Sequence, residues 1–219
     1  MSTVFIIGGA GKVGRRLARI LTEKGHAVHA LHRQPEQAQL IRLQGAKPVS
    51  GSLTELDAAA LATMMRGCDV VVFSAGAGGK GGPEMTNAID GEGLKTAAEA
   101  AAMAGISRFL LVSAFPEASR NESTSASFEN YMRVKKQAEV VLAASSLDWV
   151  ILRPGLLLDD KGSGYVRAGL AIPYGEVARD NVAATLAEII AQPRVSRVII
   201  ELTDGEVPVR KAVQQMAER

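Results

Sequence analysis

The chain has 219 residues, of which 47% are hydrophobic and 22% are charged, a mix that suits one globular domain with a sizeable core. A formal net charge of +2 without a long basic run argues against a nucleic-acid partner. The sequence has no apolar run of membrane-spanning length, and its first apolar run lacks the charged start of a signal peptide, so we expect no membrane association. The single cysteine, Cys68, cannot form an internal disulfide and fits a reducing compartment. We therefore expect a cytoplasmic monomer or homodimer.

Short apolar runs alternate with longer segments of helical period along the whole chain. Three of these runs, VVVF, FLLV and WVIL, are apolar on both faces, which is typical of strands that helices cover on both sides. The runs predict seven strands, at residues 4–7, 28–31, 47–50, 70–74, 109–113, 149–153 and 198–202.

Helices are predicted between these strands, and several have recognisable ends. Asp57 stands three residues after Thr54 as a capping-box-like partner, and Asp180 is expected to cap the segment NVAATLAEIIA. The alternation predicts an α/β fold: a single Rossmann-like, doubly wound parallel sheet of about seven strands with helices on both faces, over residues 1–219. The other expected helices cover residues 13–25, 35–45, 54–67, 85–104, 127–145 and 210–216.

Three glycines, Gly8, Gly11 and Gly14, follow the first predicted strand and enter the first predicted helix. Glycine permits the tight turn that such a connection needs and lets backbone N–H groups approach a diphosphate. The helix N-terminus adds free N–H donors and a positive dipole end. The segment therefore predicts a dinucleotide phosphate site, which also includes Lys12 and Val13.

The G-x-x-G-x-x-G spacing, with YMRVK further along, resembles that of the short-chain dehydrogenase/reductase superfamily. More narrowly, the chain is similar to the short atypical NAD(P)-binding branch, which includes NmrA-like proteins and the flavin reductase/biliverdin-IXβ reductase group. The resemblance covers nearly the whole chain. It is carried by GGAGKVG, ALHR, AIDGEGLKTAAEAAAMAGISRFLLVSAF, YMRVKKQAEVVLAASSLDWVILRPGLLLDD and RDNVAATLAEII.

The end of the second predicted strand indicates which cofactor is preferred. It reads LHR, with Arg33 where an NAD site usually has an acidic residue. An arginine matches a ribose 2′-phosphate through charge-assisted contacts, so NADP(H) is expected in preference to NAD(H). The resemblance implies that Ser52 replaces an adenine-binding Asp, with Leu53 beside it. Ser74, Ala75 and Gly76 follow the fourth strand, where the cofactor crosses the sheet edge.

Tyr131 and Lys135 are four residues apart and share one face of a predicted helix. The resemblance implies that this pair carries carbonyl reduction, with the lysine lowering the pKa of the phenol and holding the nicotinamide ribose. It also implies an active hydroxyl after the fifth strand, where the chain has Ser113 followed by Ala114. Either Ser113 is that hydroxyl or the hydroxyl is missing. In the related enzymes, the backbone of Pro154 and Gly155 meets the nicotinamide.

The sequence favours an NADP(H)-dependent oxidoreductase that transfers hydride to a small carbonyl, quinone or flavin-type acceptor. One alternative is a non-catalytic, NADP(H)-sensing NmrA-like protein, and another is a nucleotide-sugar epimerase or dehydratase. A small substrate region is expected from residues 115–128 and 155–180. No metal site is expected, because His29 and His32 would lie on opposite faces of a strand.

Overall fold

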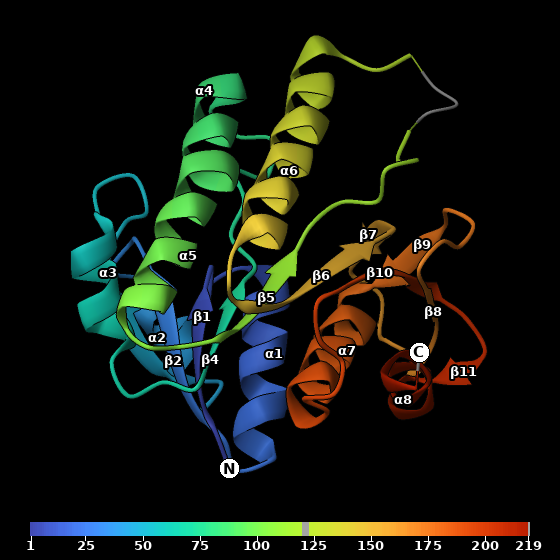
Figure 1. Ribbon diagram of the computed structural model, residues 1–219, viewed down its shortest axis with the longest axis horizontal. Coiled ribbons are helices and arrows are strands. Elements are labelled where there is room, and N and C mark those ends of the chain that lie inside the picture. The colour runs from blue at the N-terminus through green and yellow to red at the C-terminus, as the bar shows by residue number, and fades with distance from the viewer. Residues whose placement is uncertain (120–122, 219) are drawn as a thin grey trace.

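The computed structural model describes residues 1–119 and 123–218 and places their strands in two sheets. The larger sheet has nine strands in the order β11-β8-β10-β6-β5-β4-β1-β2-β3, and the smaller one pairs β7 with β9 (Figure 1). The strands are β1 Thr3–Ile7, β2 Ala27–His32, β3 Lys47–Ser50, β4 Val70–Phe73, β5 Arg108–Val112, β6 Asp148–Pro154, β7 Leu156–Leu158, β8 Tyr165–Gly169, β9 Glu176–Ala178, β10 Val198–Asp204 and β11 Val207–Pro208.

The strand order confirms the predicted fold class but corrects the number of strands from seven to nine in the main sheet. The run from β3 through β1 to β6 is the doubly wound Rossmann order. All seven predicted strands are present. The two additional strands are β8, of five residues, and β11, of two, and β8 runs antiparallel to both β10 and β11. They were missed because their sequences have no sustained apolar run: β8 pairs with β10, and β11 pairs with β8.

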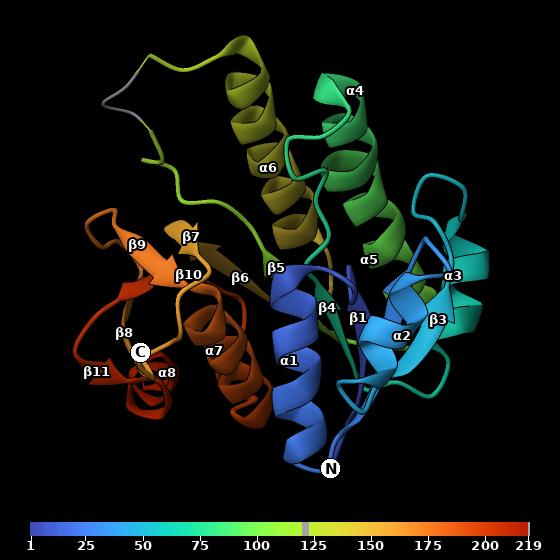
Figure 2. The ribbon, with the colours of Figure 1, turned by 180° about the vertical axis from the view of Figure 1, so that it is seen from behind.

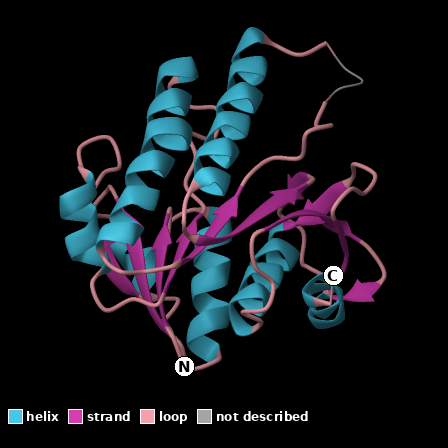
Figure 3. Cartoon of the chain, viewed as in Figure 1, coloured by secondary structure: helices cyan, strands magenta, loops and turns pink. Residues whose placement is uncertain are grey.

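Helices cover both faces of the main sheet, as the two opposite views in Figures 1 and 2 and the cartoon in Figure 3 show. Alternate strand residues divide between two buried clusters, with Val4 and Ile6 on one face and Phe5 and Ile7 on the other. The helices that pack on the first face are α1 Lys12–Glu23, α2 Gln37–Arg42, α7 Arg179–Ala191 and α8 Val209–Ala217. Those that pack on the second face are α3 Ala58–Met65, α5 Gly93–Met103 and α6 Ala126–Ala144.

The segment predicted as one helix over residues 85–104 is three consecutive pieces. Helix α4 (Gly82–Thr86) leads into a π-helical segment, η1 (Asn87–Glu92), and then into α5. A π-helical turn inserts an extra residue into the helical path, a backbone change that the side-chain pattern does not reveal. As a result, Asp90 is buried.

Two capping expectations also needed correction. Asp57 is itself the N-cap of α3, since its side chain accepts a hydrogen bond from the Ala60 N–H. Asp180 lies in the first turn of α7, where Ala178 is the N-cap, and its carboxylate binds Arg16 instead. None of the described helices is long and apolar enough to cross a membrane.

A buried ionic group fastens α6 to the sheet. Arg153 on β6 donates two hydrogen bonds to Glu139 of α6, of 2.9 and 2.7 Å, and its guanidinium lies 3.6 Å from the Glu201 carboxylate of β10. All three side chains are buried. Removing one member of such a group leaves a charge without its partner in a poorly solvated place, which is costly.

Replacement of Arg153 by methionine should therefore lower the free energy of unfolding by about 3–5 kcal/mol. Urea denaturation followed by circular dichroism measures the change. The control is Arg167→Met on β8, where the arginine is exposed and the expected change is within about 0.5 kcal/mol. Equal stabilities of the two variants would show that the buried group does not hold α6 in place.

Candidate functional site

The glycine turn between β1 and α1 is held by close backbone packing. Gly8 has a φ of +82°, and a Cβ there would lie 2.6 Å from the Ala75 nitrogen. A Cβ at Gly14 would lie 2.5 Å from the Gly8 carbonyl oxygen. These two glycines are therefore required by the fold itself. Gly11 has a φ of −69°, which any residue can adopt, and the nearest atom to an added Cβ is the Gly8 oxygen at 3.0 Å.

The N-terminus of α1 is open to a ligand. Gly11 is its N-cap, and no side chain in the described part of the chain caps it. The first-turn N–H groups of a helix have no intrahelical acceptor, so those near Lys12, Val13 and Gly14 are available to an anion. The Val13 side chain is buried in the core, so only its backbone can take part.

A cavity of about 390 Å³ opens beside this turn. The turns after β1, β2, β3 and β4 all contribute to its wall. It brings together eight of the residues predicted to bind the cofactor: Gly8, Gly11, Arg33, Ser52, Leu53, Ser74, Ala75 and Gly76.

Arg33 marks one end of this cavity, at the carboxyl end of β2. Its side chain is exposed, and among the described residues its guanidinium has no carboxylate partner. Gln37 accepts a hydrogen bond from the Arg33 backbone N–H, at 3.2 Å, which fixes the turn. Ser52 lies nearby on the cavity wall and shares a 2.8 Å hydrogen bond with Thr54. An unpaired cation at this end can accept a phosphate without first breaking an ion pair.

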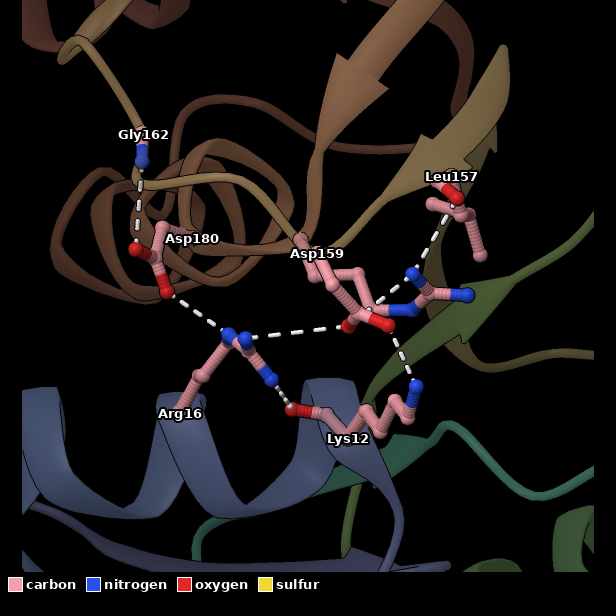
Figure 4. A network of polar contacts seen from close by, with 7 residues as sticks. Lys12, Arg16, Leu157, Asp159, Gly162 and Asp180 are labelled. Atoms are coloured by element: carbon pink, nitrogen blue, oxygen red, sulfur yellow. Dashed lines mark hydrogen bonds and ion pairs between the residues drawn. The ribbon is translucent and has the colours of Figure 1, made fainter.

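Lys12 lies at the helix N-terminus, but its ammonium group is already paired. It contacts the carboxylate of Asp159, which also lies 3.1 Å from Arg179 and 3.8 Å from Arg16 (Figure 4). Arg16 in turn binds Asp180 at 2.7 Å. Hydrogen bonding from Lys12 lowers the pKa of Asp159. The sequence gives no sign that Asp159 meets three cations from two helices, because Lys12, Arg16 and Arg179 are distant from it along the chain.

The three candidate catalytic residues lie where β5 ends and α6 passes over it. Lys135 is buried and donates a 2.9 Å hydrogen bond to the Val112 carbonyl, next to Ser113. The Ser113 hydroxyl is buried and has no hydrogen-bond partner among the described residues. Tyr131 is one turn before Lys135 on α6. An orphaned hydroxyl beside a buried lysine fits a site completed by a bound polar group.

The expected effect of Lys135 on the phenol is not observed. The pKa of Tyr131 is raised far above its usual value, first by burial and second by the negative charge of Asp90. Lys135 is paired with the same carboxylate, whose oxygen lies 3.5 Å from the lysine nitrogen. The lysine charge is therefore balanced by Asp90, and Tyr131 is a neutral phenol in the free protein.

Pro154 and Gly155 end β6, apart from the cavity that Arg33 and Gly8 line. A Cβ on Gly155 would lie 2.0 Å from the Gly175 carbonyl oxygen, so glycine is needed there for two chain segments to meet. The neighbouring Tyr174 ring packs edge-on against Phe115, with centroids 5.3 Å apart. Parts of the two predicted substrate segments, 115–128 and 155–180, thus contact one another, although residues 120–122 of the first lie outside the described residues.

Sequence reasoning missed Asp90, the acid that pairs with Lys135. The available signal was a carboxylate at helical spacing from the apolar residues Leu94 and Ala97, where a buried side chain is expected. Within the described residues, no group of three or more His, Cys, Asp or Glu is arranged to hold a metal ion.

Comparison with known proteins agrees with this geometry. Residues 8–193 match a family model described as NAD(P)H-binding. The chain is 35% identical over 218 residues to an uncharacterized sugar epimerase, YhfK, of Bacillus subtilis, covering 97% of this chain and 99% of that protein. A solved structure from Bacillus halodurans, provisionally assigned as an NAD-dependent epimerase/dehydratase, has a TM-score of 0.90 and 31% identity and covers 98% of this chain and 100% of that one.

The protein therefore belongs to the NAD(P)H-binding family of Rossmann-like domains. Its structural neighbours lie in the atypical short-chain dehydrogenase/reductase and epimerase/dehydratase group, as the motifs predicted. ChuY, an anaerobillin reductase from Escherichia coli O157:H7, shares the fold with a TM-score of 0.76 at 24% identity, covering 94% of this chain and 98% of that one.

Because backbone packing requires glycine at Gly8 and Gly14 but not at Gly11, substitution of Gly11 tests where the cofactor binds. Gly11→Val should leave the protein folded and weaken NADPH binding at least tenfold, because a branched side chain would fill the space where a diphosphate meets the helix N-terminus. Calorimetric titration measures the affinity, and circular dichroism checks the fold. Gly14→Ala is the contrasting variant, because its Cβ meets backbone and should destabilise the fold. Normal NADPH binding by a folded Gly11→Val protein would place the dinucleotide elsewhere.

Proposed function

We propose that this protein is an NADP(H)-dependent reductase that transfers hydride to a small carbonyl, quinone or flavin-type acceptor. The observation that carries the proposal is the contact of the buried Lys135 with the Val112 carbonyl, next to the unpartnered Ser113 hydroxyl at the carboxyl end of β5, with Tyr131 one turn earlier on the same helix. These groups supply a proton donor, a buried cation and a hydrogen bond beside the predicted dinucleotide site. Lys12, Val13, Gly14, Pro154 and Gly155 would complete the backbone and phosphate contacts.

Each of these side chains has a definable part in the reduction. The bound cofactor supplies the hydride. For a carbonyl acceptor, Tyr131 donates its phenolic proton to the oxygen while the carbon gains the hydride, so that the C=O double bond becomes an alcohol. Lys135 stabilises the phenolate left behind and offers an N–H to the nicotinamide ribose. Ser113 can donate a hydrogen bond to the acceptor oxygen.

Tyr131 holds the proton that reduction of a carbonyl consumes. Burial and the charge of Asp90 raise the pKa of its phenol, so it is protonated in the free protein. Oxidation of an alcohol would instead require the phenolate as a base.

A second cavity, of about 300 Å³, lies beside Lys135, whereas Tyr131 and Ser113 do not line it. Ala114 and Lys135 belong to its wall, together with the cationic side chains Arg133, Lys136 and Arg153. Its size suits a small acceptor, and we infer that residues 115–128 and 155–180 help to bind the substrate. The same proposal includes a monomer or homodimer in the cytoplasm, a reducing compartment that suits the free, buried Cys68.

Two other functions have specific support. Ala114 in place of a second hydroxyl favours an NADP(H)-sensing protein without turnover. The 35% identity to a protein named a sugar epimerase favours an epimerase or dehydratase. An NADPH oxidation assay with aldehydes, quinones and flavins, and a separate assay with nucleotide sugars, distinguishes the three. No oxidation above background with any acceptor would overturn the reductase.

The first test concerns the choice of cofactor. Because Arg33 is an unpaired cation where the ribose phosphate is expected, NADPH should bind at least tenfold more tightly than NADH, a difference of about 1.4 kcal/mol or more. Arg33→Ala should remove this preference, whereas Arg42→Ala, an exposed arginine on α2, should keep it. Calorimetry with both dinucleotides gives the six affinities of the unaltered protein and the two variants. Equal binding of NADPH and NADH by the unaltered protein would contradict the NADP(H) assignment.

The second test concerns proton donation. Tyr131→Phe should lower the rate of carbonyl reduction by about a hundredfold or more, with little change in NADPH affinity. Lys135→Ala should lower both, because it also loses the ribose contact. Steady-state kinetics and calorimetry provide the two readouts. For a flavin acceptor the loss in Tyr131→Phe should be much smaller, since the ring needs no phenol, and an unchanged rate with a carbonyl would remove Tyr131 from the mechanism.

A further inference from the structure

A buried carboxylate links the cofactor-binding loop to the candidate catalytic helix. Asp90 is 2% exposed, and its Oδ2 accepts a 3.0 Å hydrogen bond from the Ala77 N–H, in the loop after β4 that lines the larger cavity. Its Oδ1 lies 3.5 Å from the Nζ of Lys135, which is 5% exposed. One carboxylate therefore touches both parts of the proposed site.

The local backbone is arranged to admit this carboxylate. Asp90 lies in the π-helical segment η1, and π-helical turns are rare and often occur at functional sites. A Cβ on Gly76 would lie 3.0 Å from the Asp90 Oδ1, so the glycine leaves room for the acid against the loop. The η1 turn and Gly76 are independent features, and both favour the same contact.

The contact between Asp90 and Lys135 balances the positive charge of the buried lysine. Lys135 has three N–H donors, and the structure provides two oxygen acceptors, the Val112 carbonyl and Asp90, so one donor is left for a ligand. Burial lowers the pKa of Lys135, and Asp90 opposes that shift most strongly. Glu139, one turn further along α6, acts in the same sense but is itself held by Arg153.

We propose that Asp90 is a positioning residue of the reductase site: it keeps the buried Lys135 charged and fixes that ammonium group to the loop that contacts the cofactor. The proposal rests on the function proposed above and adds a residue to it. Asp90 acts through Lys135, which it contacts directly. Its negative charge also disfavours the phenolate of Tyr131, so the phenol is protonated before the reaction.

The test replaces Asp90 by asparagine, which removes the charge and keeps an oxygen for the Ala77 N–H. The titration of Lys135 is followed by nuclear magnetic resonance of the lysine side-chain carbon next to nitrogen, with Lys135→Met identifying the signal. In Asp90→Asn the lysine should lose its proton at a pH lower by about one unit or more, as expected for a buried amine without its counter-ion. The matched control is Glu92→Gln, an exposed acid of the same η1 segment, which should leave the titration unchanged.

Measurement of NADPH affinity separates the effect of the Asp90 charge from the effect of its contact with the loop after β4. Asp90→Asn should bind NADPH within about threefold of the unaltered protein, because the loop contact is retained. Asp90→Ala removes the contact as well, and its affinity should fall by about tenfold or more. An unshifted Lys135 titration in Asp90→Asn, or unaltered NADPH affinity in Asp90→Ala, would overturn the proposal.

The two proposals fail in different ways. The lysine titration requires no acceptor, so an absence of turnover would reject the reductase and leave the Asp90–Lys135 coupling measurable. Normal turnover with an unshifted lysine would reject only the role of Asp90. If Asp90→Asn does not fold, the double variant Asp90→Asn/Lys135→Met decides: recovery of folding supports the charge balance, and continued failure overturns it.

Discussion

The common register of the central parallel strands is the constraint on which the rest of the structure depends. Ile7 of β1 pairs with Phe73 of β4, which pairs with Leu111 of β5, which pairs with Ile151 of β6. Because these strands are parallel, their carboxyl ends and the turns that follow reach one edge of the sheet. The glycine turn, the β4 loop and Ser113 are therefore close together although more than a hundred residues separate the first from the last.

Above this edge, the site depends on burying charge in balanced groups. Lys135 and Glu139 are one helical turn apart on α6, and each meets a partner from a different element: Asp90 of η1 for the lysine and Arg153 of β6 for the glutamate. Burial of a single unpaired charge is strongly unfavourable, whereas a paired, hydrogen-bonded group is tolerated. The position of α6 over β5 and β6 thus determines both the local stability and the electrostatics around Tyr131.

A second ionic group, centred on the Asp159 carboxylate, is more exposed to solvent than the group of Arg153 and Glu139. The Asp159 carboxylate meets Lys12 and Arg16 of α1 and Arg179 of α7, and so joins the segment after β7 to the helix that follows the glycine turn (Figure 4). Exposed ion pairs contribute little to stability and can be exchanged for other partners. The ionic group of Arg153 is therefore buried beneath α6, whereas the ionic group of Asp159 is partly open to solvent at the N-terminus of α1.

The sequence by itself determined the strand–helix alternation, the seven parallel strands of the main sheet, the glycine turn and eight residues of the cavity wall. Each follows from local properties: apolar runs, helical period, and the conformational freedom of glycine at Gly8. The tertiary structure alone decided the antiparallel β8 and β11, the π-helical η1, the pairing of Asp90 with Lys135 and the raised pKa of Tyr131. The sequence suggested that the lysine would lower that pKa, because a spacing of four residues places Tyr131 and Lys135 on one face. The direction of the pKa shift of Tyr131 depends on burial and on the carboxylate of Asp90, forty-one residues earlier in the sequence. Only the packing of η1 against α6 brings that carboxylate near the phenol.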